Sequence, residues 1–442
     1  MDHMRKFNIK TLGCKVNQCE SDAMAREIKN SMALSPGSGD EGDVIVINTC
    51  TVTQKASMQS RQAIRKAIRE NPDAKVLVTG CYAQTAPHEI AAIKGVHAVI
   101  GNREKTRISQ FILGDHNTCQ PILACGDING QKRFSSFSRT AFGKRTRPFL
   151  KIQDGCDAFC TYCIVPRARG RSRSMPADSV MEQIDRLNKS GFKEVVLTGI
   201  HLGCYGIDLA PRSSLTEILS GIRKKGLMGR VRVSSIEPGE LGNDIIMLAA
   251  LPETERGVLC RHFHIPLQSG DNTILERMGR PYDRDYFGTL VHRIKKRLPD
   301  AAIGVDILIG FPGETEKAFE NTYSLIKVLP VSYLHVFPFS PRKKTPAFSY
   351  PDRIPDKIIR SRCKLMRDLG MVKKGAFYQS QVGKTAQVLV ETTRDRTTGL
   401  LKGFTSNYVS VQFKGGDPYC NTFQMVRIDR LDSTGKPMGT IV

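Results

Sequence analysis

The sequence contains no tryptophan, and no apolar run in it approaches the length of a membrane span. The missing tryptophan excludes nothing, but the missing apolar runs argue against a membrane-spanning chain. Acidic residues are scarce as well, because 43 Asp and Glu stand against 66 Lys and Arg, a net charge of +23. Such an excess of positive charge favours an anionic polymer as the partner.

A secretory signal peptide is also not evident in the sequence. We therefore expect a reducing, cytoplasmic location, in which the 13 cysteines serve as metal ligands rather than in disulfides. The 442 residues are too many for one ordinary hydrophobic core, so two or three domains are expected.

The most informative stretch is KIQDGCDAFCTYCIVPRARGRSR, residues 151–173. It places Cys156, Cys160 and Cys163 in a CxxxCxxC pattern just after an expected strand. No second CxxC follows to complete a zinc tetrahedron, although buried or zinc-binding thiols remain the alternative. Three thiolates suit a 4Fe-4S cluster with one open iron, and the pattern resembles the signature of radical S-adenosylmethionine (SAM) enzymes, in which SAM chelates that iron.

Aromatic and basic side chains surround these cysteines. Phe159 and Tyr162 lie between them, where a ring could pack on an adenine. Alternating arginines follow, and they could hold the SAM carboxylate or RNA phosphates; these are Arg167, Arg169, Arg171 and Arg173. We take Arg167 as a candidate SAM contact.

Three earlier cysteines share one kind of position. Cys14, Cys50 and Cys81 each come two residues after a short apolar, β-branched run. Those expected strands are residues 7–12, 43–48 and 75–79, with helices over 20–29 and 54–70 and a fourth strand over 97–100. Alternating strands and helices predict a parallel, flavodoxin- or Rossmann-like sheet, and ligands gather beyond the carboxyl ends of such strands.

We therefore expect these three thiols to converge and to hold a second 4Fe-4S cluster with an open iron. The alternative is three unrelated buried thiols. Cys19 lies five residues after Cys14 and is interpreted as structural.

The central part repeats a strand and helix unit six times, which predicts a partial (βα)6 relative of the (βα)8 barrel. Expected strands are 149–153, 194–197, 231–234, 261–265, 303–309 and 332–338, and expected helices are 176–189, 214–225, 244–250, 282–297 and 314–328. Several strands end in turns that could let a cofactor approach the backbone, namely TGIHLG (198–203), SSIEP (234–238), PLQSG (266–270) and GFPGET (310–315). Candidate cofactor contacts in these turns are Thr198, Gly199, Ser235 and Glu237. His201 and His264 are interpreted as structural rather than as metal ligands.

Two further segments are basic. Residues 120–148 predict a polar linker, whose cations are either solvated or in contact with phosphate: Lys132, Arg133, Arg139, Lys144, Arg145 and Arg147. Short strands over 386–391, 400–405, 408–413 and 422–430 predict a small C-terminal β-barrel. Its basic and aromatic residues fit RNA binding, with at least half of the aromatics expected in the barrel core: Lys373, Lys374, Lys384, Arg394, Arg396, Lys402, Lys414, Phe404, Tyr408 and Phe413.

Nearly the whole chain resembles the methylthiotransferase family of radical SAM enzymes. The matching stretches are TLGCKVNQ (11–18), NTCTVT (48–53), TGCYAQ (79–84) and GCDAFCTYCIVPRARGRSRS (155–174), followed by a TRAM-like C-terminal segment. The resemblance implies four parts: an N-terminal methylthiotransferase domain (1–118), a linker (119–141), a radical SAM domain (142–374) and an RNA-binding TRAM domain (375–442). It also implies SAM and two 4Fe-4S clusters, an auxiliary one on Cys14, Cys50 and Cys81 and a SAM-binding one on Cys156, Cys160 and Cys163.

Within the family, LTGIHLGCYG (197–206), SSIEP and YLHVFPFSPR (333–342) resemble the MtaB type. That type adds a methylthio group to carbon 2 of N6-threonylcarbamoyladenosine at tRNA position 37, beside the anticodon. Departures are Cys19, where members often carry an aromatic residue, and the SPGSGDEG stretch (35–42); neither touches an expected ligand. An aromatic C–H bond offers no useful acidity, so we expect no catalytic side-chain acid or base and leave the reaction to the clusters and SAM.

Other functions remain open at this stage. The chain could act on isopentenyladenosine in tRNA or on a ribosomal-protein aspartate, or it could be a non-catalytic iron–sulphur RNA-binding protein. The wording TFGCQMN, usual at the start of the isopentenyladenosine branch, is missing here. Expected partners are tRNA carrying threonylcarbamoyladenosine, a one-electron reductant and a sulphur source, with the chain a monomer and no membrane involved.

Overall fold

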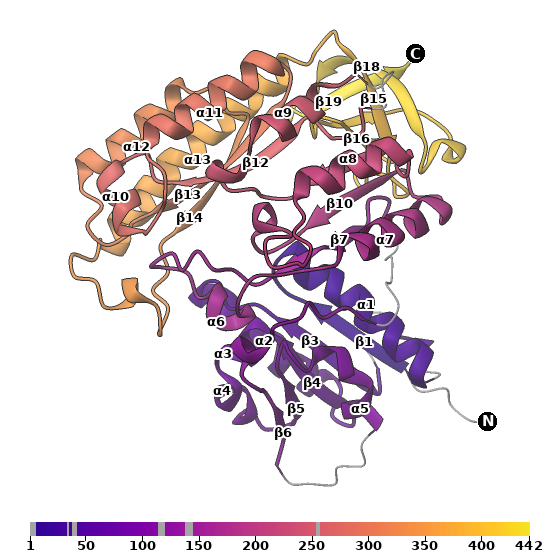
Figure 1. Ribbon diagram of the computed structural model, residues 1–442, viewed down its shortest axis with the longest axis vertical. Helices are drawn as coiled ribbons and strands as arrows, with labels where there is room; N and C mark the ends of the chain where they lie inside the picture. The colour runs from indigo at the N-terminus through magenta and orange to yellow at the C-terminus, as the bar shows by residue number, and fades with distance from the viewer. Residues whose placement is uncertain (1–5, 33–34, 38–41, 114–119, 138–144, 253–256) are drawn as a thin grey trace.

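A six-stranded parallel sheet forms the N-terminal part of the molecule, drawn from indigo to magenta in Figure 1. This computed structural model describes residues 6–32, 35–37, 42–113, 120–137, 145–252 and 257–442. The strand order is β2-β1-β3-β4-β5-β6. The strands are β1 (Lys6–Thr11), β2 (Ser35–Pro36), β3 (Val44–Thr49), β4 (Lys75–Gly80), β5 (Val96–Ile100) and β6 (Ile122–Ala124).

Helices cover both faces of this sheet, and its central strands β3 and β4 are accordingly continuous, buried apolar runs. They are α1 (Lys15–Met32), α2 (Gln54–Glu70), α3 (Cys81–Thr85), α4 (Pro87–Ala91) and α5 (Ile108–Leu113). Successive residues of β3 alternate between two cores, since Ile45 and Ile47 pack with α2 whereas Val44 and Val46 pack with α1 and α5. The Thr53 hydroxyl caps α2 by accepting from the Ala56 N–H.

The expected parallel sheet is confirmed, and its four predicted strands agree with the structure to within one residue at each end. The helix expected over residues 20–29 is longer and starts at Lys15. Part of the expected linker is not a free connector, because β6 pairs with β5 and extends the sheet. Arg139 and Lys144 of that linker lie outside the described residues.

The central part contains six parallel strands that curve into an open arc (Figure 1). Three form one sheet, β7 (Phe149–Lys151), β10 (Glu194–Thr198) and β11 (Arg230–Val233), and three form another, β12 (His262–Gln268), β13 (Ala302–Ile309) and β14 (Tyr333–Pro338). Two isolated bridges, Val231 to Leu259 and Ser235 to His264, join β11 to the segment of β12. The partial (βα)6 barrel is thereby confirmed.

Helices cover the outside of the arc and enclose the largest hydrophobic core of the chain. They are α7 (Ala177–Lys189), α8 (Leu215–Lys225), α9 (Asn243–Ala250), α10 (Asn272–Arg277), α11 (Arg284–Arg297) and α12 (Glu316–Val328). Helix α8 begins with a full capping box between Ser214 and Glu217 and ends at Gly226 in the left-handed conformation (φ 62°). No helix in the described ranges combines the length and the apolar composition needed to cross a membrane.

A long helix, α13 (Asp356–Gln379), packs along β14 and leads into a closed five-stranded barrel, yellow in Figure 1. The barrel strands are β15 (Thr385–Val390), β16 (Leu401–Thr405), β17 (Ser410–Phe413), β18 (Phe423–Leu431) and β19 (Pro437–Ile441). The sequence predicted four of them but neither β19 nor α13, and the expected boundary at residue 374 falls inside α13. Phe413 lies in the barrel core, as expected for part of the aromatic set.

Candidate active site built from two groups of thiols

Cys14, Cys50 and Cys81 converge at one edge of the N-terminal sheet, as the sequence predicts. They follow β1, β3 and β4, which are neighbours in the sheet, at the carboxyl ends of the strands. Their thiolates are close enough to repel one another. Gly13 makes the approach possible, because a Cβ on this residue (φ 99°) would lie 2.9 Å from the Cys50 Sγ. Burial raises the pKa of the Cys50 thiol to about 12.

Other cysteines near this triplet are engaged elsewhere. The Cys19 thiol donates to the Phe149 carbonyl (3.3 Å), which agrees with its structural interpretation. The Cys125 thiol donates to the carbonyls of Ala83 (3.6 Å) and Val99 (3.5 Å). These contacts leave three thiols as the donor set at this edge of the sheet.

The second triplet lies in the loop between β8 (Gln153–Asp154) and α6 (Val165–Arg169). Strands β8 and β9 (Arg173–Ser174) pair antiparallel and close the loop at its base. Cys163 is close enough to Cys160 and Cys156 for their charges to interact, and burial raises the pKa of its thiol to about 12. The structure therefore also brings these three thiols together.

Both triplets fit a polynuclear cluster better than a single ion. Within the described ranges, only two groups bring three ligand atoms within 4.8 Å of one another: His201 with Cys204 and Glu240, and His264 with Asp306 and His335. Neither group is a cysteine triplet. The sulphur atoms of each triplet are therefore spread more widely than in these two groups, which suits a 4Fe-4S cluster held by three thiolates on separate irons.

Nitrogen donors contact two sulphur atoms of the second triplet. The His201 Nδ1 lies 3.3 Å from the Cys156 Sγ, and its Nε2 lies 2.5 Å from a Glu240 carboxylate oxygen. The Arg280 guanidinium donates to the Cys160 Sγ (3.2 Å) and pairs with Glu237. His201 thus does more than the structural role that the sequence suggested, since it directly contacts an expected ligand.

Arg169 connects the two triplets. This side chain is buried, and it leaves α6 six residues after Cys163. Its Nε donates to the Cys81 Sγ (3.3 Å), and its terminal nitrogens donate to Glu20 (2.6 Å) and Asn17 (2.5 Å). The helix that directly follows the loop of one triplet therefore supplies a cation to a thiol of the other, which brings the two segments into contact.

A buried ion network surrounds this connection. Glu20 also accepts from Lys105 (2.7 Å) and Lys151 (2.8 Å). Burial alone would raise the pKa of Glu20, but Arg169, Lys105 and Lys151 outweigh burial and hold the pKa well below its usual range. Ionised groups thus join the N-terminal sheet to the central (βα)6 barrel, and this set of ion pairs is complete only when the two parts are in contact.

The sequence suggested that the four arginines after the cysteine loop form one cationic edge, but in the structure they are separated. Arg169 and Arg173 are buried, and Arg173 donates to backbone carbonyls. Arg171 is exposed and lies over the Phe159 ring, 4.9 Å from its centroid. Arg167 is exposed and donates to the Lys344 carbonyl (2.9 Å), in a loop after β14.

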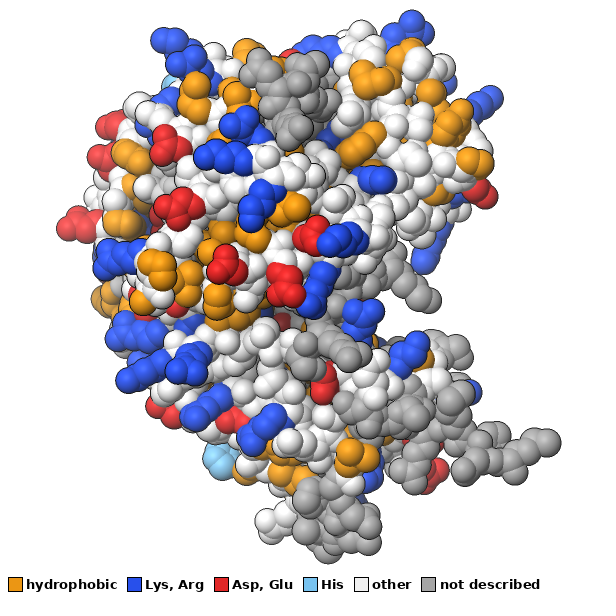
Figure 2. Space-filling model, turned by 45° about the vertical axis from the view of Figure 1, so that its right-hand side comes forward, with side chains coloured by type: hydrophobic (Ala, Val, Ile, Leu, Met, Phe, Trp, Pro, Cys, Tyr) orange, Lys and Arg blue, Asp and Glu red, His pale blue; other side chains and the backbone are white. Residues whose placement is uncertain are grey.

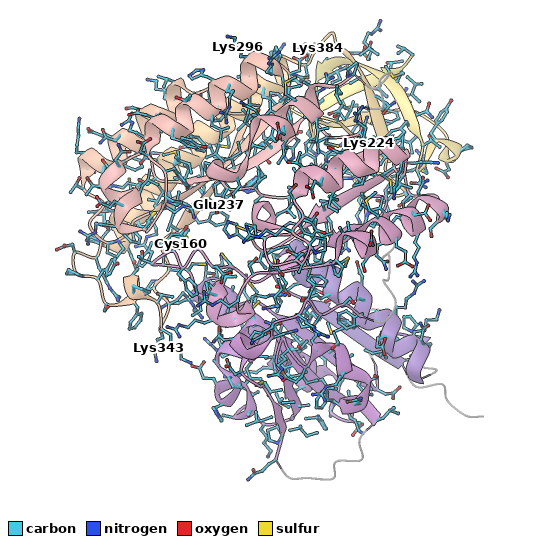
Figure 3. The ribbon with its side chains drawn as sticks, viewed as in Figure 1. Cys160, Lys224, Glu237, Lys296, Lys343 and Lys384 are labelled. Carbon is cyan, nitrogen blue, oxygen red and sulfur yellow. The ribbon has the colours of Figure 1, made fainter. Side chains whose placement is uncertain are left out.

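The other candidate cofactor contacts divide into two sets. Tyr162 packs against Phe311 and lies close to Arg280, and Glu237 pairs with Arg280, so both adjoin the second triplet. Figure 3 shows Cys160 and Glu237 between the N-terminal sheet and the barrel. Phe159 is 51% exposed, in a left-handed conformation (φ 45°).

The remaining candidates lie at the carboxyl ends of β10 and β11. Thr198 is buried and accepts from the Ile152 N–H through its carbonyl. Gly199 has no room for a Cβ, which would meet Gln153 Oε1 at 2.8 Å. Ser235 is exposed and pairs with His264. Sequence reasoning missed Arg280, because it lies 120 residues from Cys160 and no spacing pattern marks it.

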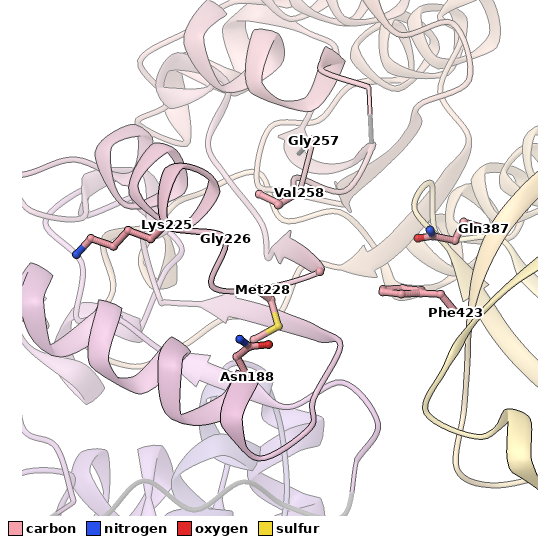
Figure 4. A pocket seen from close by; sticks show the side chains of 9 residues that line it. Asn188, Lys225, Gly226, Met228, Gly257, Val258, Gln387 and Phe423 are labelled. Atoms are coloured by element: carbon pink, nitrogen blue, oxygen red, sulfur yellow. The ribbon is translucent and has the colours of Figure 1, made fainter. Parts of the chain in front are cut away.

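A cavity of about 580 Å³ lies elsewhere, between the C-terminal barrel and the ends of α7 and α8. Figure 4 shows Gln387 and Phe423 of the barrel on one side of it and Asn188 and Met228 on the other. A second cavity of about 410 Å³ adjoins the first triplet's domain and is strongly basic, with Arg61, Arg342, Lys343 and Lys344 in its lining. Lys and Arg side chains are also spread over the face drawn in Figure 2.

Several residues expected to bind RNA are engaged within the protein. Phe404 lies under the Arg147 guanidinium (3.9 Å to the ring centroid), and Tyr408 lies under Arg232 (4.7 Å). Lys373 donates to the carbonyls of Lys327 and Leu329. The C-terminal barrel therefore uses these aromatic rings to pack against the central part rather than to present an open stacking surface.

Comparisons with known proteins agree with this architecture. Residues 6–101 match the family described as "Uncharacterized protein family UPF0004", and residues 150–326 match the radical SAM superfamily. The threonylcarbamoyladenosine tRNA methylthiotransferase MtaB of Bacillus subtilis is 38% identical over 95% of this chain and 92% of its own. The protein of the same name from Aquifex aeolicus is 36% identical over 96% and 99%.

More distant relatives are similar as well. The tRNA-2-methylthio-N(6)-dimethylallyladenosine synthase of Clostridium botulinum is 32% identical over 97% of this chain and 95% of its own. Among solved structures, the radical SAM methyltransferase TsrM of Kitasatospora setae superposes with a TM-score of 0.58 at 16% identity, covering 78% of this chain and 77% of that one. This last likeness concerns the fold alone.

Proposed function

The chain belongs to the radical SAM tRNA methylthiotransferases, and from this premise we propose that it adds a methylthio group to carbon 2 of N6-threonylcarbamoyladenosine at tRNA position 37. The observation that carries the proposal is the 38% identity to the Bacillus subtilis enzyme over 95% of the chain. The radical SAM superfamily implies SAM and one 4Fe-4S cluster.

We propose that Cys156, Cys160 and Cys163 hold the SAM-binding cluster, and that an auxiliary cluster is held by the other triplet of Cys14, Cys50 and Cys81. In this proposal each triplet supplies three thiolates and leaves one iron of its cluster open. With both clusters bound, reductive cleavage of SAM would supply the oxidant that removes hydrogen from the adenine ring, and the auxiliary site would supply the sulphur.

The protein's own residues have three tasks in this scheme. Arg280 and His201 donate to two sulphur atoms of the SAM-binding triplet, which favours the thiolate form. Arg169 gives one thiol of the auxiliary triplet a fixed positive neighbour and holds the two triplets at a common region. We assign Glu237 and Tyr162 to the SAM side of the site because both adjoin Arg280, and the buried side chains of Arg169 and Arg280 limit access of water there.

Positive surface around this region would bind the tRNA backbone. The cavity lined by Arg61, Arg342, Lys343 and Lys344 lies between the N-terminal sheet and the loop after β14. The Arg342 guanidinium donates there to the hydroxyls of Thr51 (2.6 Å) and Ser57 (3.1 Å), and Thr51 directly follows Cys50 in the sequence. A phosphate held in this cavity would fix the anticodon stem beside the auxiliary triplet.

The proposal also covers the parts and partners that the sequence suggested. We assign the methylthiotransferase domain to the N-terminal sheet, which continues through β6 (Ile122–Ala124), the radical SAM domain to the central barrel and the TRAM domain to the C-terminal barrel; α13 (Asp356–Gln379) connects the last two. The enzyme acts as a monomer in the cytoplasm and depends on a one-electron reductant and a sulphur source.

Nucleoside analysis of tRNA tests this function. The purified, anaerobically reconstituted protein should convert threonylcarbamoyladenosine in tRNA to its 2-methylthio derivative, detected by mass spectrometry, and tRNA from a strain lacking the gene should lose that nucleoside. The same assay with tRNA that carries isopentenyladenosine is the comparison, because a relative from Clostridium botulinum is named for that activity. Methylthiolation of isopentenyladenosine alone would refute the proposal.

A further inference from the structure

In the central barrel, the sheet of β12, β13 and β14 has an interior face that is unusually polar and open. On β14, Tyr333, His335 and Phe337 share one face, with neighbouring ring centroids 5.4 Å and 6.3 Å apart. The alternate residues Leu334 and Val336 pack into the main core instead. His335 keeps 53% of its side chain exposed and Phe337 is 45% exposed. Barrel interiors are normally filled by branched apolar side chains, whereas the exposure of His335 and Phe337 leaves this part of the interior accessible to solvent.

A chain of hydrogen bonds crosses this face. Asp306 on β13 is the cross-strand partner of His335, whose Nδ1 lies 3.3 Å from its carboxylate. The His264 Nε2 on β12 lies 2.7 Å from the same oxygen, and its Nδ1 lies 3.2 Å from the Tyr333 hydroxyl. Lys15 of the N-terminal part reaches this region, because it lines a cavity together with Tyr408, whose ring centroid lies 4.6 Å from that of His262 on β12; its charge also interacts with that of Asp306. We call His264, Asp306, His335 and Lys15 the inner-face group.

Neighbouring contacts connect the inner-face group to both triplets of thiols. The Ile236 N–H donates to the His264 carbonyl (3.0 Å), one residue before Glu237. Glu237 in turn pairs with Arg280, which donates to Cys160. On the opposite side, Lys15 directly follows Cys14 in the sequence. A base that is held near both triplets would therefore lie close to this group.

We propose that the inner-face group binds the threonylcarbamoyl substituent of the target adenosine. The inference rests on the proposed function and names the side chains that select its substrate. The substituent carries a carboxylate, a hydroxyl and urea N–H groups. The Lys15 ammonium and the half-exposed His335 imidazole can donate to the carboxylate, and Asp306 accepts from the hydroxyl or a urea N–H.

The same arrangement explains selectivity. An isopentenyl substituent has no polar atom, so its binding would remove water from the half-exposed His335 imidazole and from Lys15 without offering a hydrogen bond in return. Sites built to hydrogen-bond a substrate group strongly reject an analogue that lacks it, because the buried polar groups are then unpaired. Exposed Phe337 offers an aromatic surface for the adenine itself.

The experiment compares two variants with the unchanged protein on matched tRNAs. His335→Phe keeps the ring but removes the donor, and Asp306→Asn keeps the shape but removes the charge. His292→Phe, on the exposed side of α11, is the matched control. Each full-length protein is reconstituted anaerobically and given one tRNA transcript in two forms, with and without the threonylcarbamoyl group, to measure binding by fluorescence anisotropy and product by mass spectrometry.

Both inner-face variants should lose about tenfold to a hundredfold in kcat/KM and in affinity for the threonylcarbamoylated tRNA, the worth of one charged hydrogen bond. Affinity for the unmodified transcript and formation of 5′-deoxyadenosine without tRNA should stay at the unchanged protein's values, as should every value for His292→Phe. Retention of the preference for the threonylcarbamoylated form by both variants would overturn the inference while leaving the proposed function intact. Inactivity of the unchanged protein on that tRNA would overturn both.

Discussion

Replacing Arg169 by Gln should loosen the contact between the N-terminal sheet and the central (βα)6 barrel. The guanidinium is 1% exposed and bonds to Glu20, Asn17 and the Cys81 thiol. Breaking a buried ion pair by removing one partner typically costs about 3 to 5 kcal/mol. Glu20 keeps two other cations, Lys105 and Lys151, so the lower end of that range applies. A loss of about 3 kcal/mol means that the contact opens roughly a hundredfold more often.

Hydrogen exchange measured by mass spectrometry reports this opening directly. Peptides from α1 and α6 should exchange about a hundredfold faster in Arg169→Gln than in the unchanged protein, if their protection arises from this contact. Arg171→Gln is the matched control two residues away, because Arg171 is 62% exposed and its pair with Asp157 is a surface pair. Exchange in Arg169→Gln within about threefold of the control would refute the role given to this arginine.

The same network predicts how the stability of this contact changes with pH. The cations hold the pKa of Glu20 below its unfolded value, which is about 4.3. Glu20 therefore stabilises the contact fully above that value, and the contribution is lost as the pH falls through the lower folded pKa. Exchange of α1 should accordingly rise on acidification below about pH 4, and an unchanged or falling rate, after correction for intrinsic exchange, would contradict the sign.

Three further predictions follow from the site. Cys163→Ala should abolish SAM cleavage, whereas Cys50→Ala should keep SAM cleavage, measured as 5′-deoxyadenosine, and lose sulphur insertion; insertion by Cys50→Ala would remove the auxiliary site. His201→Gln should lower the potential of the SAM-binding cluster by on the order of tens of millivolts in an EPR-monitored titration, because hydrogen bonds to cluster sulphur tune that potential; an unshifted potential would limit His201 to packing. Binding of tRNA should weaken steeply with salt, and Lys343→Gln should reduce the log–log salt slope by about 1; an unchanged slope would remove Lys343 from the phosphate contacts.

The sequence predicted the three-part architecture because each part has its own periodicity. Strands β3 and β4 are apolar runs buried on both faces, and the cysteines that follow them mark the carboxyl edge of the sheet. Spacing along the chain was sufficient for the two triplets, because each is set by local strand ends or by one loop. Helix α13 and strand β19 were not predicted, because α13 has a mixed polar pattern and β19 is defined by its pairing in the closed C-terminal barrel.

Residues that reach the site from distant segments could not be predicted in the same way. Arg169 was one of four alternating arginines in the sequence, and only the fold distinguishes it, buried against Glu20, from exposed Arg171. Arg280 and the inner-face group depend on which strands face each other across the barrel. The sequence predicts Phe404 as an RNA-stacking residue, but the contact between the C-terminal barrel and the central part places its ring under Arg147.

Iron and acid-labile sulphide content after anaerobic reconstitution tests the central claim most directly, since that claim is that two separate triplets of thiols each hold a cluster. The unchanged protein should contain about eight irons per chain, and Cys50→Ala and Cys163→Ala should each retain about four, from the remaining triplet. About four irons in the unchanged protein, or a loss of all iron in Cys50→Ala, would contradict two independent sites.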